Sequence, residues 1–218
     1  MVDEMICGVD EAGRGPVIGP LVVAAVSVED DSSLRRLKVR DSKQLTPVRR
    51  EELAIEIRRL ARVEVEVIEA SNLDDMMTRD NLNEIEVKAF AALISRTRAD
   101  IVYADACDVD PVRFSRNILG FLGYSPKMHC EHKADERYPV VSAASIIAKT
   151  VRDRRIREIE AELGQAIGSG YAHDEVSVAF LENWIKEKGD VPPHTRRTWE
   201  TARRKLSASK NSKLTDWE

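Results

Sequence analysis

Gly8-Val-Asp-Glu-Ala-Gly-Arg-Gly-Pro-Val-Ile-Gly-Pro20 is the stretch from which the fold of this chain can be worked out. It joins two apolar runs, Met5–Val9 and Leu21–Val28, which are both rich in Val and Ile. Short β-branched runs that are separated by glycine and proline predict two strands paired as a hairpin. Two adjacent carboxylates, Asp10 and Glu11, follow the first strand directly. An ordinary hairpin has no need of them, so this segment is a candidate functional site.

Strand and helix patterns alternate after the hairpin. Thr46 and Pro47 provide a cap and a first-turn proline for a helix that should end near Ala61. Period-two or short apolar runs predict further strands, and amphipathic runs predict further helices: the strands are 63–68, 101–105 and 127–132, and the helices are 83–98, the segment after Pro111, and most of the chain from Val140 onward. We therefore expect an α/β fold with a five-stranded mixed sheet flanked by helices, and a C-terminal helical region.

Length and composition are those of one soluble domain with an appendage. The chain has 218 residues, a hydrophobic content of 43% and a net charge of −4. We predict a catalytic domain over residues 1–190, followed by a C-terminal helix and polar tail over 191–218, and a monomer. The acidic N-terminus and the lack of an apolar run of about 20 residues predict a cytoplasmic protein that does not enter a membrane. Three cysteines without CxxC spacing predict reduced thiols.

Two more carboxylates follow predicted strands. Asp105 ends the strand 101–105, and Asp135 comes just after the strand 127–132. If these strands are neighbours of the first one, all four carboxylates meet at one edge of the sheet, where they repel each other. Bound dications would relieve this repulsion, and oxygen ligands select Mg²⁺ or Mn²⁺ over zinc. Taken singly, Asp105 could instead cap a turn, and Asp135 could begin a helix.

The glycines of the first segment also have two interpretations. Gly13, Gly15 and Gly19 are spaced G-x-G-x-x-x-G, which differs from the dinucleotide-binding fingerprint by one residue. A strand follows this spacing rather than a helix, so nicotinamide binding is disfavoured. The alternative is that the glycines let backbone N–H groups approach a sugar-phosphate, with Arg14 adding a positive charge.

Several motifs, taken together, resemble a known family. The Gly8–Pro20 segment closely resembles the N-terminal signature of ribonuclease HII, the type 2 ribonucleases H. Later blocks match the family in order: Asp41-Ser-Lys-Gln-Leu45, Tyr103-Ala-Asp-Ala106, His132-Lys-Ala-Asp135, Val141-Ser-Ala-Ala-Ser-Ile-Ile-Ala-Lys149 and Gly168-Ser-Gly-Tyr171. They span roughly residues 5 to 200, and the compact form looks archaeal. The resemblance implies a ribonuclease H-like fold.

The resemblance also implies roles for individual residues. The family's metal-binding catalytic carboxylates correspond to Asp10, Glu11, Asp105 and Asp135. Recognition of the 2′-hydroxyl at an RNA–DNA junction would fall to Gly13, Arg14, Gly15 and Tyr171. Contacts with phosphate are expected from Ser42, Lys43 and Lys149.

The implied activity is hydrolysis of RNA in RNA–DNA hybrids and cleavage 5′ of ribonucleotides embedded in duplex DNA. Two Mg²⁺ or Mn²⁺ ions would assist, and the products would carry 5′-phosphate and 3′-hydroxyl ends. Two alternatives remain: an enzyme of the ribonuclease HIII type, and a non-catalytic hybrid-binding or sliding-clamp adaptor protein. The tail Asn211–Trp217 loosely resembles clamp-binding peptides, so a sliding clamp is a further candidate partner.

Overall fold

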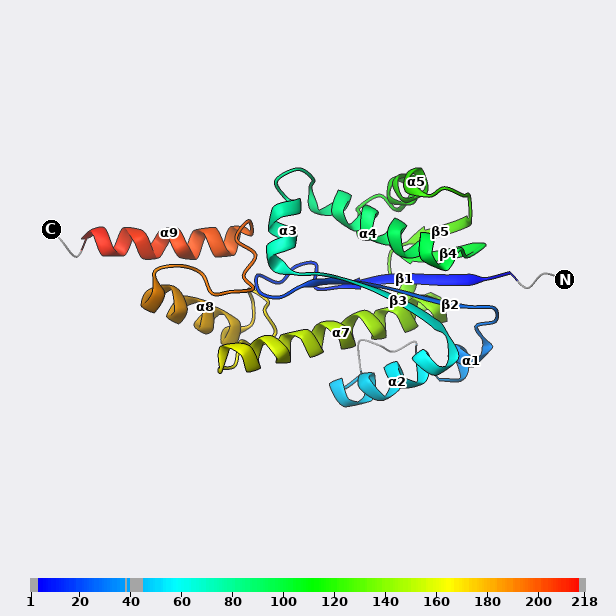
Figure 1. The fold of residues 1–218 in the computed structure, drawn as a ribbon, viewed down its shortest axis with the longest axis horizontal. Helices are drawn as coiled ribbons and strands as arrows, with labels where there is room; N and C mark the ends of the chain where they lie inside the picture. Colours follow the sequence, from blue (N-terminus) through cyan, green and yellow to red (C-terminus); the bar gives the residue numbers. More distant parts are fainter. Residues whose placement is uncertain (1–3, 38, 40–44, 216–218) are drawn as a thin grey trace. The chain divides into compact units, whose positions relative to one another are not determined.

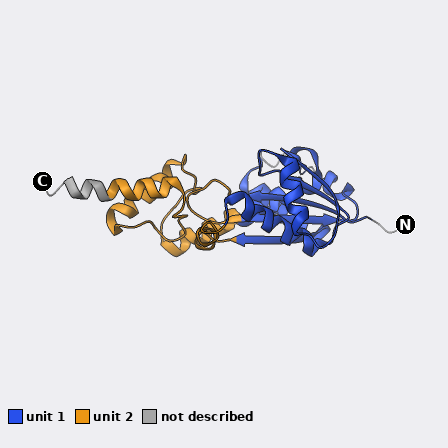
Figure 2. Ribbon diagram, turned by 90° about the horizontal axis from the view of Figure 1, so that it is seen from above, with its two compact units in different colours: residues 1–12, 22–67, 80–151 blue, residues 13–21, 68–79, 152–218 orange. Residues whose placement is uncertain are grey.

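The computed structural model describes residues 4–37, 39 and 45–215, and it describes side chains as far as residue 209. The chain forms two compact units, each assembled from separate stretches of sequence (Figure 2). Unit 1 contains residues 1–12, 22–67 and 80–151, and unit 2 contains residues 13–21, 68–79 and 152–218.

A five-stranded sheet lies in the order β3-β2-β1-β4-β5 (Figure 1). Strand β1 (Ile6–Ala12) is antiparallel to β2 (Leu21–Val28), whereas β4 (Ile101–Asp105) is parallel both to β1 and to β5 (Lys127–Glu131). Strand β3 (Arg62–Ile68) lies at the edge beside β2. The predicted mixed sheet is therefore confirmed. Strand β1 runs three residues beyond the predicted end, so Asp10 and Glu11 belong to the strand itself.

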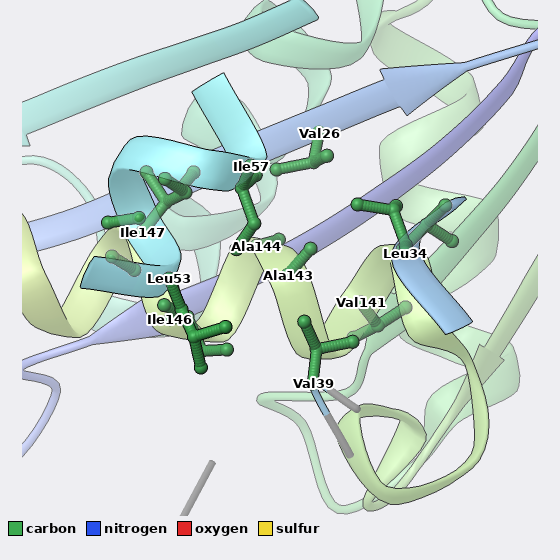
Figure 3. Packing of buried hydrophobic residues seen from close by; sticks show 14 of the residues in the cluster. Val26, Leu34, Val39, Leu53, Ile57, Val141, Ala143, Ala144, Ile146 and Ile147 are labelled. Atoms are coloured by element: carbon green, nitrogen blue, oxygen red, sulfur yellow. The ribbon is translucent and has the colours of Figure 1, made fainter. Parts of the chain in front are cut away.

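Helices cover both faces of the sheet. On one face, side chains of β2 pack against α2 (Pro47–Leu60) and the first half of α7 (Pro139–Leu163), in the cluster that Figure 3 shows. The other face is covered by α4 (Leu82–Thr97) and α5 (Pro111–Phe121) (Figure 1). Their Phe90 and Phe114 rings meet edge to face, with centroids 5.3 Å apart. Every residue of β2 is buried, as expected of a strand with helices on both sides.

The helix ends follow their sequence signals. The Thr46 hydroxyl accepts a hydrogen bond from the Arg49 N–H at 3.2 Å, with Pro47 in the first turn. Asn81 and Glu84 form a reciprocal capping box at the start of α4. Three short helices were not predicted, and each is of seven residues or fewer: α1 (Ser32–Arg36), α3 (Ala70–Met76) and α6 (Ala134–Arg137).

Unit 2 is helical around its own core. The second half of α7 packs with α8 (Glu175–Lys188) and α9 (Glu200–Thr215), and the cluster includes Val17 and Ile18. Helix α9 continues to Thr215, within the segment 191–218 that was predicted as a helix and polar tail, and the side chains from Lys210 onward are not described. Among the described helices, none is long and apolar enough to cross a membrane.

Candidate functional site

The sheet register places Asp10 beside Asp105. Val9 of β1 pairs with Ala104 of the parallel strand β4, so the next residue of each strand is an aspartate. Asp10 is only 4% exposed. The central position of β1, between β2 and β4, is what brings these two carboxylates together.

The surroundings of Asp10 oppose its ionisation. Burial is the first cause that raises its pKa well above the ordinary range, and the charges of Glu11 and Asp105 raise it further. A hydrogen bond with Ser145 and the charge of Lys149 act in the opposite direction. Without a bound cation, these surroundings therefore favour the neutral, protonated form of Asp10.

Asp135 reaches the same edge of the sheet through β5. Because β5 is parallel to β4, the chain leaves it beside Asp105 and turns at Lys133, whose φ of 58° is left-handed. The N–H of Ala134 then donates to the Asp105 carboxylate at 3.0 Å. Asp135 is the next residue and is 3% exposed. The structure thus places Asp10 beside Asp105, and Asp105 beside the turn that carries Asp135.

Glu11 lies on the opposite side of β1 from the Ser145 partner of Asp10, as strand alternation requires. Its carboxylate forms a group with Glu86 of α4 and Cys107, in which the ligand atoms lie within 4.8 Å of one another. Burial, followed by the charges of Glu11 and Glu86, raises the pKa of Cys107 well above its ordinary value. Cys107 is therefore a neutral thiol here, and it is a poor metal ligand in that state.

Glu86 was missed by the sequence analysis, although a signal was present. It is fully buried on α4, where apolar residues recur at helical spacing. A carboxylate within that stripe, between Ile85 and Val87, is unusual for a core helix. The sequence does not show which strand the apolar face of α4 packs against, so it could not indicate that Glu86 lies near Glu11.

Lys149 lies close to Asp10 on α7. Its ammonium group donates to the Ser145 hydroxyl at 2.8 Å, and Ser145 is in turn a hydrogen-bond partner of Asp10. The predicted phosphate contact of Lys149 thus falls next to the carboxylates. Ser42 and Lys43, also predicted to contact phosphate, lie outside the described residues.

The side chains present fit a divalent metal ion. Asp10, Asp105 and Asp135, together with Glu11 on the other side of β1, offer oxygen donors, which are the ligands that Mg²⁺ and Mn²⁺ prefer. A dication beside Asp10 would remove the electrostatic cost of placing it next to Glu11 and Asp105. The acidic donor set, and not any single residue, is the argument for metal binding.

A second group of predicted site residues comes together in unit 2. Gly13 has a φ of 88°, and a Cβ there would lie 2.5 Å from the Pro20 carbonyl oxygen, so only glycine fits. Gly15 is exposed, and a Cβ built on it would lie 3.7 Å from the Tyr171 ring. The loop is tied down by the N–H groups of Val17 and Ile18, which both donate to the Gly170 carbonyl.

A buried arginine, Arg152, packs against the ring of Tyr171. The guanidinium of Arg152 lies 5.1 Å from the centre of the Tyr171 ring and donates to the Ser169 carbonyl at 2.7 Å. Because Arg152 is 5% exposed, burial lowers its pKa below the ordinary value. The loop of Gly13, Arg14 and Gly15 thus lies close to Tyr171 within unit 2.

The fold and the acidic site together define a class. A mixed sheet in the order β3-β2-β1-β4-β5, with carboxylates at the ends of adjacent strands, is the architecture of ribonuclease H-like enzymes. The family model described as Ribonuclease HII matches residues 7–202. The chain belongs to the ribonuclease HII family and is a ribonuclease H.

Individual relatives agree with this assignment. Ribonuclease HII of Thermococcus kodakarensis is 48% identical over 204 residues, which cover 91% of this chain and 88% of the relative. Ribonuclease HII in a PCNA complex from Archaeoglobus fulgidus is 45% identical, with a TM-score of 0.86 over 92% of this chain and 96% of its own. Bst-RNase HIII in complex with Mn²⁺ has a TM-score of 0.79 over 96% of this chain and 71% of its own; at 20% identity it shares the fold alone.

Proposed function

We propose that this protein is an endoribonuclease that hydrolyses the RNA strand of RNA–DNA hybrids and cuts on the 5′ side of ribonucleotides embedded in duplex DNA. The products would carry 5′-phosphate and 3′-hydroxyl ends. The observation that carries the proposal is the parallel register of β1 and β4, which pairs Val9 with Ala104 and so sets Asp10 next to Asp105.

Two divalent ions, Mg²⁺ or Mn²⁺, would be held by Asp10, Glu11, Asp105 and Asp135. When bound, such ions supply an activated water and stabilise negative charge on the departing 3′ oxygen. The protein's own contribution is to orient the carboxylates. The Ala134 N–H fixes Asp105 through its hydrogen bond of 3.0 Å, and Ser145 holds Asp10 with Lys149 behind it. Lys149 is also proposed to contact a substrate phosphate, together with Ser42 and Lys43.

Selectivity for RNA is proposed to come from the loop of Gly13, Arg14 and Gly15 together with Tyr171. The 2′-hydroxyl is the group that distinguishes RNA from DNA at a single nucleotide. The exposed Gly15 lets a sugar approach the backbone closely, and the adjacent Tyr171 ring offers a flat surface against that sugar. The rigid support of Tyr171 by Arg152 favours a fixed recognition surface.

The C-terminal segment is proposed to bind a sliding clamp through Asn211–Trp217. The support is the loose motif resemblance and the relative from Archaeoglobus fulgidus, which was solved in a complex with PCNA. Pull-down with PCNA should recover full-length protein and lose a chain truncated after Leu206; equal recovery would exclude this binding site.

We further propose residues 1–190 as the catalytic domain, 191–218 as the helix and tail, and a cytoplasmic monomer that acts in DNA replication and ribonucleotide excision repair.

The experiment that tests the function is cleavage of a labelled DNA duplex that contains one ribonucleotide. The wild-type protein should cut 5′ of the ribonucleotide with Mg²⁺ or Mn²⁺ and not with EDTA. Asp105→Asn should lower the rate by at least about 10³-fold, as expected when a metal-binding catalytic carboxylate is lost. Cleavage limited to longer RNA runs would indicate specificity of the HIII type. Binding without cleavage would support the adaptor alternative.

A further inference from the structure

Arg196 is the largest fully buried side chain in the described part of the protein, with an exposed fraction of 0%. It lies in unit 2, in the segment between α8 and α9. An ionised guanidinium in a protein interior is costly unless hydrogen bonds satisfy its donors. The hydrogen-bond partners of Arg196 therefore show what offsets the cost of burying its charge.

Three of its donors point at one loop. Nε donates to the Gly19 carbonyl at 2.9 Å, Nη1 to the Arg14 carbonyl at 3.0 Å, and Nη2 to the Gly13 carbonyl at 2.5 Å. The main chain joins the same contact, since the Arg196 N–H donates to the Val17 carbonyl at 2.8 Å. The guanidinium lies 4.8 Å from the centre of the Trp199 indole ring, which keeps its plane in place.

These bonds determine where the loop's amide groups point. In a trans peptide the C=O and the N–H of the next residue point in opposite directions. Because the Gly13 and Arg14 carbonyls point inward to Arg196, the N–H groups of Arg14 and Gly15 are directed away from it. The buried positive charge also polarises both peptide units, which makes those N–H groups stronger donors.

We propose that Arg196 is the positioning residue of the ribose-recognition loop: it fixes and polarises the peptide units after Gly13 and Arg14, so that their amide groups can read the 2′-hydroxyl. This inference rests on the proposed role of that loop in the function above. Arg196 itself does not touch the substrate. Its effect should therefore appear in the discrimination of RNA from DNA.

The test compares Arg196→Lys with Arg197→Lys. Lysine keeps the charge, but its single ammonium group cannot span three carbonyls as the planar guanidinium does. Arg197 is the matched control, because its exposed guanidinium pairs with Asp190 at 2.6 Å on the surface. For each variant, kcat and KM are measured on a duplex with one ribonucleotide, and Ki is measured for the same duplex made only of DNA.

Arg196→Lys should lower kcat/KM for the ribonucleotide substrate by about tenfold, mainly through KM, which corresponds to roughly one weakened hydrogen bond. Its Ki for the DNA duplex should match that of Arg197→Lys, although its Tm should be lower, because lysine leaves buried carbonyls without a donor. An unchanged kcat/KM, or an equal weakening of DNA binding, would overturn the proposal. If Arg196→Lys does not fold, Trp199→Leu takes its place. If kcat/KM for the ribonucleotide duplex and Ki for the DNA duplex are both unchanged in Trp199→Leu, the proposal is overturned.

Gly15→Ala distinguishes a failure of this inference from a failure of the proposed function. The added methyl group has room beside Tyr171, so the variant should fold, but the methyl would occupy the path to the loop amides. If Gly15→Ala loses discrimination and Arg196→Lys keeps it, the loop reads the sugar without help from Arg196. If both variants keep it, the loop does not read the sugar.

Discussion

Asp10 is 4% exposed and has Glu11 and Asp105 as neighbours, so its charge destabilises the protein when no cation is bound. Sites that hold catalytic metals commonly reduce the stability of the folded chain in this way, because their charges are arranged for the ligand and not for the apoprotein. Removing the charge of Asp10 should therefore raise the stability of the metal-free protein and lower its activity.

Asp10→Asn should therefore abolish cleavage and raise the Tm of the metal-free protein. A raised pKa in the folded state means that the neutral form is favoured there, and asparagine supplies a neutral side chain at every pH. We expect an increase of about 2–4 °C at pH 7.5 in EDTA, the shift that about 1 kcal/mol gives a chain of this size. Thermal melts at pH 7.5 and pH 5 check this, and the gain should shrink at the lower pH as wild-type Asp10 takes up a proton. A lower Tm for the variant in EDTA would contradict the electrostatic explanation.

Gly8 controls how closely α7 approaches β1. A Cβ at this position would lie 2.2 Å from the carbonyl carbon of Val140, in backbone that cannot move as a flexible side chain could. The close approach brings Ser145 and Lys149 of the same helix to Asp10. A single missing methyl group thus connects helix packing with the geometry of the acidic site.

Gly8→Ala should lower the free energy of unfolding by about 3 kcal/mol or more, because it overpacks a closed contact. Gly120→Ala is the matched control: Gly120 lies in α5 with nothing within 4 Å of its added Cβ, so it should be neutral or gain about 0.5–1 kcal/mol. Urea unfolding of both variants measures the difference. Equal stability of the two would mean that α7 can move back without cost.

Asp174 connects the Tyr171 loop to the start of α8. Its carboxylate accepts hydrogen bonds from the Ser169 N–H at 2.6 Å, the Ser169 hydroxyl at 2.8 Å and the Ser177 hydroxyl at 2.8 Å, and it also caps α8. These bonds lower the pKa of Asp174 from 3.8 to about 2, with the Ser169 N–H as the largest cause. The loop that presents Tyr171 is therefore held by an ionised side chain.

Asp174→Asn should destabilise the protein at neutral pH, and the difference from wild type should disappear in acid. A carboxylate with a lowered folded pKa contributes its full stability above its ordinary pKa and loses it as the pH falls from about 4 to about 2. Melting temperatures between pH 6 and pH 2.5 test this, with the exposed Asp75→Asn as the control. A difference that keeps its full neutral-pH size at pH 2.5 would assign the effect to the shape of the side chain and not to its charge.

At the scale of the whole molecule, the sequence predicted the sheet well because each strand contains a recognisable apolar run, although β1 extends beyond its predicted end. Apolar β-branched runs and a capping residue such as Thr46 act locally, and local signals can be recognised in a single sequence. The motifs also singled out Asp10, Asp105 and Asp135 as candidates, since a carboxylate at a strand end is visible before the strand order is known.

Long-range pairings could not be predicted in the same way. That Glu86 would lie beside Glu11 depends on which side of β1 receives α4, and that Arg196 would bind the Gly13 loop depends on contacts almost the full length of the chain apart. Short helices such as α3 carry too few residues to show a periodicity. The division into two units was not predicted either, because unit 2 is collected from three separate segments.

The strand order has a consequence for how the chain folds while it is being synthesised on the ribosome. Strand β1 is an inner strand, but its neighbour β4 is synthesised much later. Val9 therefore has no pairing partner on the β4 side until Ala104 has left the ribosome. At translation speeds of about 5–20 residues per second, the β1–β2 hairpin would spend on the order of ten seconds with one bare edge. Such an edge is a template for mispairing with other nascent chains. We therefore expect overproduction in a fast-translating host to yield aggregates that slower synthesis avoids, and the soluble fraction at two induction temperatures is the measurement that checks it.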